Sequence, residues 1–333
     1  MISIVMPAYN VGKYISNTLD SLIKQTYKNW ELIISDDCST DNTVDIIREY
    51  QKRYSNITLI RERHNHGGAR IPRYNAILAA KGKYVCPIDA DDCIETKFLE
   101  KVIERKKETN ADVVLGRMIV CNEDLSPRDR CIPDKNYNIN EIFTGREACR
   151  RTIGRWEIAM NGLLTSKDLY VNFINKIDLS TFSEGFADET DQRKFLLTAK
   201  SVAMTDANYF YRQQPGSVVH DCSTRAYNSL ITDKIQLSFV IETFKEENDV
   251  LLKMFNEYIE KLYRAQQRYS LNQHKYNKEE KTRIKKLIKQ SYYAIEEYSM
   301  EFNGWRNRLL GSSIYIFKLY TGVISLCIKY LKK

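Results

Sequence analysis

Residues 84–92 read Tyr84-Val85-Cys86-Pro87-Ile88-Asp89-Ala90-Asp91-Asp92, an apolar run that ends in three carboxylates. A short apolar run of this kind is typical of a buried strand, so we expect the acids to lie at the strand's carboxyl end. Mg²⁺ and Mn²⁺ take one or two carboxylate ligands and fill their other positions with water and phosphate oxygens. The stretch alone leaves two interpretations open: a metal site, or acids that cap the following helix.

Strand and helix patterns alternate on both sides of this stretch. Apolar runs predict strands at residues 2–6, 30–35, 57–62, 84–89 and 112–120, with helical periodicity between them. The alternation predicts an α/β fold with a mostly parallel central sheet flanked by helices. Ligands bind beyond the carboxyl ends of such strands, where residues 7–10, 35–38 and 89–92 gather small and acidic side chains. This convergence favours the metal site over the helix cap.

The rest of the chain has a different character. Residues 121–145 are polar and contain Pro127 and Pro133, which predicts a long surface loop. From about residue 226 the pattern is all-helical and contains no proline. The eight cysteines form no C-x-x-C pair and the four histidines are scattered, so we expect reduced, packed thiols and no zinc site.

Positive charge is concentrated in the C-terminal third. The net charge is +8, and residues 231–333 hold 19 Lys and Arg against 12 Asp and Glu. Such a balance indicates an anionic partner, either nucleic acid or anionic lipid, or else a solvated helical face. Residues 314–333 are largely apolar but interrupted by Lys318, so they suit a helix lying in a membrane interface better than one spanning it. Docking of this helix on the protein's own core is the alternative.

Taken together, these clusters resemble the family 2 glycosyltransferases, nucleotide-sugar-dependent enzymes of the GT-A fold. The matching segments, in the family's order and spacing, are residues 3–10, 22–27, 35–41, 80–84 and 89–92. The resemblance covers roughly residues 1–220. It implies a GT-A catalytic domain over 1–225, with 1–120 binding the nucleotide sugar and 121–225 on the acceptor side. Residues 226–333 would form a helical region ending in a basic amphipathic helix.

The resemblance also implies a donor site. A uracil-like base needs a flat partner and a hydrogen-bond acceptor, which Tyr9 and Asp37 can supply from neighbouring strand ends. Asp91 would bind the metal, Mn²⁺ or Mg²⁺, that bridges the two phosphates. The implied nucleotide-sugar-binding residues are Pro7, Ala8, Tyr9, Asp36, Asp37, Arg73, Asp89, Ala90 and Arg212.

Three positions depart from the family's pattern. Tyr74 replaces the Asn that usually follows Arg73, and Ala76 replaces a usual Gly. Cys38 stands where Gly is usual after Asp37. These departures leave open the phosphate contacts and the turn after Asp37.

The catalytic base is implied by a second segment. An inverting transfer needs a carboxylate that takes the proton from the acceptor hydroxyl. In the family this acid follows a Phe-x-Glu-Gly segment, here residues 182–185, so the candidates are Asp188 and Glu189. The spacing to the strand that starts near residue 200 favours Asp188. A capping box that opens the following helix is the alternative reading.

The expected protein is an inverting glycosyltransferase of cell-surface polysaccharide synthesis. Its donor would be a nucleoside diphosphate sugar, with UDP-sugars expected first, and its acceptor a saccharide or lipid-linked saccharide. Met1 is followed by a strand and not by a secretory signal, so we expect a cytoplasmic enzyme, peripheral on an anionic membrane surface, with no nucleic acid partner. The alternatives are a haloacid-dehalogenase-like phosphohydrolase, whose motif wants Thr or Val where Cys93 stands, and an inactive glycosyltransferase-like binding subunit.

Overall fold

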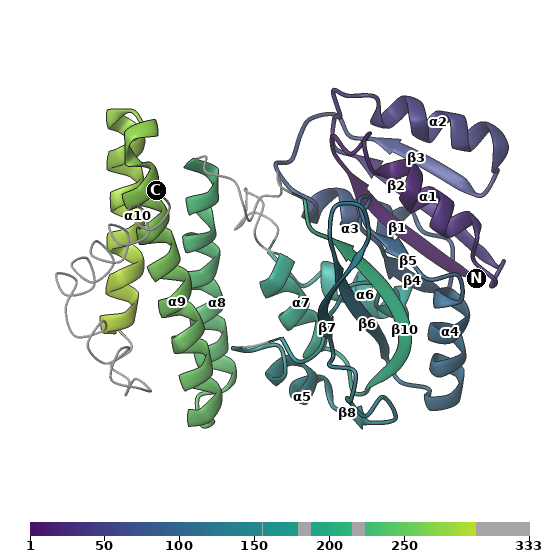
Figure 1. Cartoon of the computed structure of the whole chain (residues 1–333). Coiled ribbons are helices and arrows are strands. Elements are labelled where there is room, and N and C mark those ends of the chain that lie inside the picture. The colour runs from purple at the N-terminus through teal and green to yellow at the C-terminus, as the bar shows by residue number, and fades with distance from the viewer. Residues whose placement is uncertain (155, 179–187, 215–223, 298–333) are drawn as a thin grey trace. The chain divides into compact units, whose positions relative to one another are not determined.

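The chain forms two compact units. The structure, a computed structural model, describes residues 1–154, 156–178, 188–214 and 224–297 (Figure 1). The first unit comprises Met1–Thr152 with Trp156–Pro215, and the second comprises Ile153–Arg155 with Gly216–Lys333.

The first unit is built on one mixed sheet. Its strands are β1 (Ile2–Ala8), β2 (Trp30–Asp36), β3 (Ile57–Arg61), β4 (Tyr84–Pro87), β5 (Cys93–Ile94), β6 (Val113–Cys121), β7 (Pro127–Ile132), β8 (Ile142–Phe143), β9 (Leu164–Ser166) and β10 (Val202–Arg212). The main order is β3-β2-β1-β4-β9-β6-β10-β5. Neighbours from β3 to β4 are parallel, as are β6 and β10, whereas β9 is antiparallel to both β4 and β6. The mostly parallel α/β sheet predicted from the sequence is confirmed.

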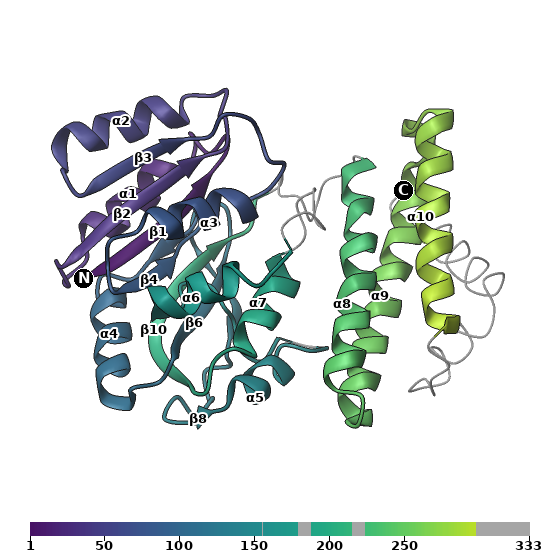
Figure 2. The ribbon, with the colours of Figure 1, turned by 180° about the vertical axis from the view of Figure 1, so that it is seen from behind.

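Helices cover both faces of this sheet. They are α1 (Ile15–Ile23), α2 (Thr43–Arg53), α3 (Arg70–Ala79), α4 (Phe98–Thr109), α5 (Gly145–Arg150), α6 (Lys167–Ile174) and α7 (Asp188–Leu196). Helices α3 and α6 lie on the face that is nearer the viewer in Figure 2. Helices α1 and α2 lie on the opposite face, as in Figure 1.

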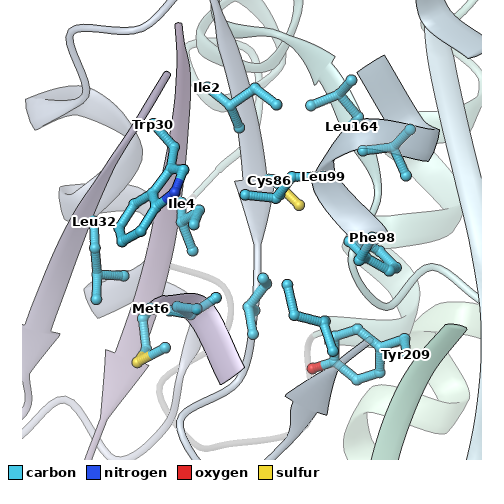
Figure 3. Packing of buried hydrophobic residues seen from close by; sticks show 14 of the residues in the cluster. Ile2, Ile4, Met6, Trp30, Leu32, Cys86, Phe98, Leu99, Leu164 and Tyr209 are labelled. Carbon is cyan, nitrogen blue, oxygen red and sulfur yellow. The ribbon is translucent and has the colours of Figure 1, made fainter. Parts of the chain in front are cut away.

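The alternation of side chains along β1 explains why helices cover both faces of the sheet. Ile2, Ile4 and Met6 point into one apolar cluster with residues of α1, α2 and α4, and all three are fully buried (Figure 3). The residues between them face the α3 side and are buried as well. Strand β1 is therefore buried on both faces, which is why the sequence shows a nearly continuous apolar run there.

The predicted loop at 121–145 is wrong in part. Residues 127–132 form strand β7, which pairs antiparallel with β6, and residues 142–143 form β8, which pairs with β10. Strand β7 is an exposed edge strand that begins with Pro127 and carries Arg and Asp side chains. A proline at the start of an edge strand removes no ladder hydrogen bond, and charges on an edge discourage unwanted pairing. In the sequence, a proline beside charged residues looks like a polar loop, which explains why this strand was not predicted.

Gly82 lies where β1 passes closest to the turn before β4. A Cβ added there would lie 2.8 Å from the Ser3 backbone nitrogen and 2.9 Å from the Met1 carbonyl oxygen. Because backbone atoms cannot swing aside, we expect Gly82→Ala to lower the free energy of unfolding by about 1–3 kcal/mol. Urea denaturation measures this change. Lys81→Ala, at the exposed neighbouring position, is the control and should stay near wild type; an equally stable Gly82→Ala protein would show that the two segments can separate.

The second unit is helical in its described part. It contains the 3₁₀ turns η1 (Thr224–Asn228) and η2 (Gln273–Lys275) and the helices α8 (Ser229–Thr243), α9 (Asn248–Asn272) and α10 (Lys278–Glu297). The predicted all-helical character is confirmed for these residues, whereas the amphipathic segment 314–333 lies outside them. None of the helices that the structure describes is both long and apolar enough to cross a membrane.

Candidate active site

The three acids of the opening stretch lie beyond the carboxyl end of β4, as predicted. Asp92 is 1% exposed and is held by strand β10. Its Oδ2 accepts a hydrogen bond from the Tyr209 hydroxyl at 2.7 Å, and its Oδ1 accepts one from the Arg212 backbone N–H at 2.8 Å. Burial, followed by the charges of Asp91 and Asp89, raises the pKa of Asp92 well above its ordinary value. Asp92 therefore holds residues 89–92, which we call the acid loop, against β10.

Asp91 is hydrogen-bonded by a neutral side chain and lies beside another carboxylate. The Gln214 side chain donates a hydrogen bond to its Oδ2. Burial and the neighbouring Asp89 carboxylate raise the pKa of Asp91 to about 6, and the opposing effects of Gln214 and Arg212 are smaller. A divalent cation bound there would remove this repulsion, so the residue fits a metal ligand. Among the residues that the structure describes, no three His, Cys, Asp or Glu side chains are grouped to hold a metal, so phosphate and water would supply the other ligands.

Asp89 is paired with helix α3. Its side chain is 35% exposed, and its Oδ1 lies 3.0 Å from Arg73 Nη2. The Asp89 backbone N–H donates to the Tyr209 hydroxyl oxygen at 3.1 Å, so one phenol links two members of the acid loop. Ala90, between the acids, is buried, and its carbonyl accepts from the Thr18 hydroxyl.

Arg212 lies behind the acid loop. Its Nε donates to the Asp91 carbonyl at 2.7 Å, and its Nη1 donates to the Glu123 carbonyl. The guanidinium also lies over the Tyr14 ring, 4.9 Å from the ring centroid. Arg212 thus fixes the backbone of Asp91, while the predicted contact with a diphosphate stays a prediction.

The predicted base pocket lies at the ends of β1 and β2. Pro7 and Ala8 are buried in β1, whereas the Tyr9 side chain that follows them is 47% exposed. The Asp37 carboxylate accepts from the His66 backbone N–H at 2.9 Å, and its Oδ1 lies 2.8 Å from His66 Nδ1. An exposed ring beside a fixed acid is what a planar base needs.

Two neighbours of Asp37 clarify the turn after β2. Asp36 is fully buried; its Oδ2 accepts a hydrogen bond from the Ser39 backbone N–H at 3.1 Å and forms an ion pair with Arg61, whose Nε lies 3.1 Å away. Cys38 has φ +66°, in the left-handed region that favours glycine. The turn therefore keeps the backbone conformation expected for the family's Gly, although a Cys occupies the position.

The two base candidates open helix α7. Asp188 is its first residue, with a side chain outside the described set, and Glu189 is exposed. Burial and the carboxylates of the acid loop raise the pKa of Tyr211 to about 12, and Glu189 contributes to the same shift. Charges of the acid loop and of the start of α7 therefore both act on Tyr211.

Some residues of this site were not predicted. Gln214 and Tyr209 hold Asp91 and Asp92, and Asp191 of α7 is bound by Arg70 and Tyr74 of α3. Tyr209 lies in a stretch with the alternation typical of a strand, and that alternation could have indicated that its side chain faces the acids. No local pattern pairs Asp191 with Arg70, which is 121 residues away.

The sheet order, the acids beyond β4 and the helical extension define a protein of the GT-A type. Residues 1–349 of Staphylococcus aureus TarS, solved in complex with UDP-GlcNAc, superpose with a TM-score of 0.66 over 96% of this chain and 89% of that one. The sequence identity is 20%, so this similarity concerns the fold.

The chain belongs to glycosyl transferase family 2, whose family model matches residues 3–157. The glycosyltransferase GlyG of Streptococcus pneumoniae serotype 4 is 30% identical over 222 residues, which cover 66% of this chain and 73% of GlyG. The poly(ribitol-phosphate) beta-glucosyltransferase of Bacillus spizizenii is 32% identical over 63% of this chain. The match spans only 32% of that relative's length. The predicted family is confirmed, and the haloacid-dehalogenase-like alternative loses its support.

Proposed function

We propose that this glycosyltransferase moves a sugar, with inversion, from a UDP-sugar to a hydroxyl group of a cell-surface polymer or its lipid-linked precursor. The observation that carries the proposal is that helix α3 contacts both the acid loop and helix α7. Arg73 Nη2 lies 3.0 Å from Asp89 Oδ1, and Arg70 and the Tyr74 hydroxyl bind Asp191 of the helix that begins with the base candidates. An activated donor and a proton acceptor have to meet for an in-line attack.

We assign the role of each site residue in this reaction from its contacts in the structure and from the family resemblance. Tyr9 and Asp37 take the base, and the Arg73–Asp89 pair joins helix α3 to the acid loop. Asp91 would hold the divalent cation, and the cation would supply positive charge to the leaving diphosphate. Asp188, or Glu189 beside it, accepts the proton of the attacking hydroxyl. Residues 1–120 serve the donor and 121–225 the acceptor.

The acceptor class rests on relatives. One is described as a poly(ribitol-phosphate) beta-N-acetylglucosaminyltransferase, TarP of S. aureus, and another as a putative teichuronic acid biosynthesis glycosyltransferase, TuaG of Bacillus subtilis. Both poly(ribitol-phosphate) and teichuronic acid are anionic polymers. A saccharide or polyol hydroxyl on an anionic surface polymer is therefore the acceptor we propose.

Binding of the donor is tested by thermal shift. We expect UDP and one UDP-sugar to raise the melting temperature in Mn²⁺ or Mg²⁺, with a smaller shift in EDTA and none from GDP-mannose. At a ligand concentration of about 100 Kd the stabilisation is about 2.7 kcal/mol. No shift from any UDP compound would contradict the donor class. A thermal shift without sugar transfer to any acceptor, measured as UDP release, would favour the inactive binding subunit.

Helix α10 supports the proposed anionic membrane surface. Lys278, Lys281, Lys285 and Lys289 recur at spacings of three and four residues, which places them on one stripe. Ile284, Ile288 and Tyr292 of the same helix are buried, and the stripe runs along the edge of this buried side. Lys278, Lys285 and Lys289 are exposed, so they can meet anionic lipid.

Vesicle flotation tests this surface. Each lysine near an anionic bilayer contributes about 1 kcal/mol, so replacing the four with Gln should reduce binding to phosphatidylglycerol vesicles at least about tenfold. The matched control replaces Lys24, Lys81, Lys97 and Lys107, four exposed lysines of the first unit, with Gln. Equal binding by both variants, or equal binding to neutral phosphatidylcholine, would contradict the proposal. Competition by a soluble anionic polymer without vesicle binding would point to the acceptor instead.

A further inference from the structure

Helix α3 carries three residues on one face that contact two separate parts of the proposed site. Arg70, Arg73 and Tyr74 stand at i, i+3 and i+4, so their side chains lie side by side. We call them the α3 face. Arg73 reaches Asp89 of the acid loop at 3.0 Å. Arg70 and Tyr74 reach Asp191 of helix α7.

The contact with Asp191 is buried and polar. Arg70 Nε lies 2.5 Å and the Tyr74 hydroxyl 2.8 Å from Asp191 Oδ2, and Arg70 Nη2 lies 3.3 Å from Oδ1. The side chains of Arg70 and Asp191 are 8% and 7% exposed. A buried carboxylate that loses one of these donors keeps its desolvation cost, so the arrangement is held tightly.

The position of Asp191 on α7 connects this contact with the proposed catalytic base. It lies on α7 one turn after Asp188 and two residues after Glu189, the candidates for the base. Arg70 Nη2 also lies 3.4 Å from the Asp178 carbonyl, so one guanidinium contacts residues before and after 179–187. Displacement of the first turn of α7 would require these bonds to break.

Tyr74 is also one of the departures from the family's pattern. Its hydroxyl points to Asp191, and its ring packs edge-on against Tyr170 of α6 at a centroid distance of 6.4 Å. Burial and the neighbouring charges raise the pKa of Tyr74 far above its ordinary value, so the phenol stays protonated and donates. The residue that replaces the family's Asn thus serves the acceptor-side helix.

We propose that the α3 face is a positioning element: it fixes the distance between the donor acids, through Arg73 and Asp89, and the base on α7, through Tyr74, Arg70 and Asp191. This inference rests on the proposed function. Asp191 is a positioning residue and not the base, since both of its oxygens accept hydrogen bonds from α3. A small displacement of a reacting group is costly in rate, because catalysis needs near-attack geometry.

Tyr74→Phe tests the proposal with the removal of one oxygen atom. We expect kcat to fall about tenfold, while the KM and Kd for the UDP-sugar stay within about twofold. Tyr50→Phe is the control, because the Tyr50 hydroxyl likewise lies 2.6 Å from a carboxylate oxygen, Asp20 Oδ1, between α2 and α1. It removes the same type of bond away from α7 and should leave kcat unchanged. Equal kcat values for the two variants would overturn the proposal.

A second variant separates positioning from proton transfer. Asp191→Asn should lower kcat about a hundredfold and keep the wild-type shape of the pH–rate profile. Loss of the acidic limb of that profile would mean that Asp191 is itself the base, which overturns its positioning role. Arg70→Lys keeps the positive charge but loses the bidentate contact with Asp191, so its kcat should lie between those of wild type and Asp191→Asn.

Hydrogen exchange tests the same idea without turnover. Amides of residues 188–196 should exchange faster in Tyr74→Phe than in wild type, and at the wild-type rate in Tyr50→Phe. Unchanged exchange in Tyr74→Phe would overturn the proposal even if no sugar transfer is found. Absence of wild-type transfer with faster exchange in Tyr74→Phe would instead contradict the proposed function.

Discussion

Replacing Asp188 with Asn should lower kcat for sugar transfer by about 10²–10⁴-fold, the usual contribution of a general base. The amide has nearly the same shape as the carboxylate but cannot accept the proton of the acceptor hydroxyl. Asp188 begins α7, whose next residue acts electrostatically on Tyr211 together with the acid loop. Donor binding should remain, because no donor contact is proposed for this residue. Steady-state transfer and UDP-sugar titration measure the two effects separately.

Glu189→Gln is the natural control, since it makes the same chemical change one residue away. We expect it to lower kcat by less than about tenfold, through the loss of one nearby charge. Full activity of Asp188→Asn with an inactive Glu189→Gln would move the base to Glu189. If both variants remain active, neither acid takes the proton and the base lies elsewhere.

The position of the proposed donor half of the site can largely be predicted from the sequence. Strands β1, β2 and β4 are short apolar runs, and the residues that matter follow directly after each run. Parallel neighbours bring those ends to one edge of the sheet, so the strand pattern alone predicts Tyr9, Asp37 and Asp91 at that edge. The departure at Cys38 could not be resolved in this way. Its positive φ is a property of the backbone that side-chain chemistry alone does not reveal.

The acceptor half is less readable because its contacts join distant segments. Asp191 sits in the polar run of α7, where an acid is ordinarily solvated, yet it is buried and bound by Arg70. Likewise, Asp92 resembles a helix cap in the sequence but is buried against Tyr209 of the last strand of the sheet. In each case tertiary packing, and not the local pattern, decides whether a charged residue faces water or the interior.

Asp91→Asn should reduce kcat/KM by about 10²–10⁴-fold, because charge stabilisation by a bound cation is worth several kcal/mol in the transition state. The amide is a weaker ligand for a hard cation and brings no charge. Activity that remains should no longer depend on Mn²⁺, and isothermal titration of UDP with Mn²⁺ should show weaker binding. Asp206→Asn, an exposed acid of β10 paired with Lys101, makes the same change elsewhere and should keep full activity.

The stability of Asp91→Asn distinguishes a lost metal ligand from a damaged fold. In the metal-free protein the pKa of Asp91 is raised to about 6, so its carboxyl group stabilises the fold when protonated, and this contribution is lost as the pH rises through about 6. At pH 8 in EDTA the ionised side chain therefore costs stability, and a neutral Asn removes that cost. We expect the variant to melt at the same temperature as wild type at pH 4 and at a higher one at pH 8. Lower melting at both pH values would mean that the Gln214 contact at Asp91 is structural, and the loss of activity would then say nothing about a metal.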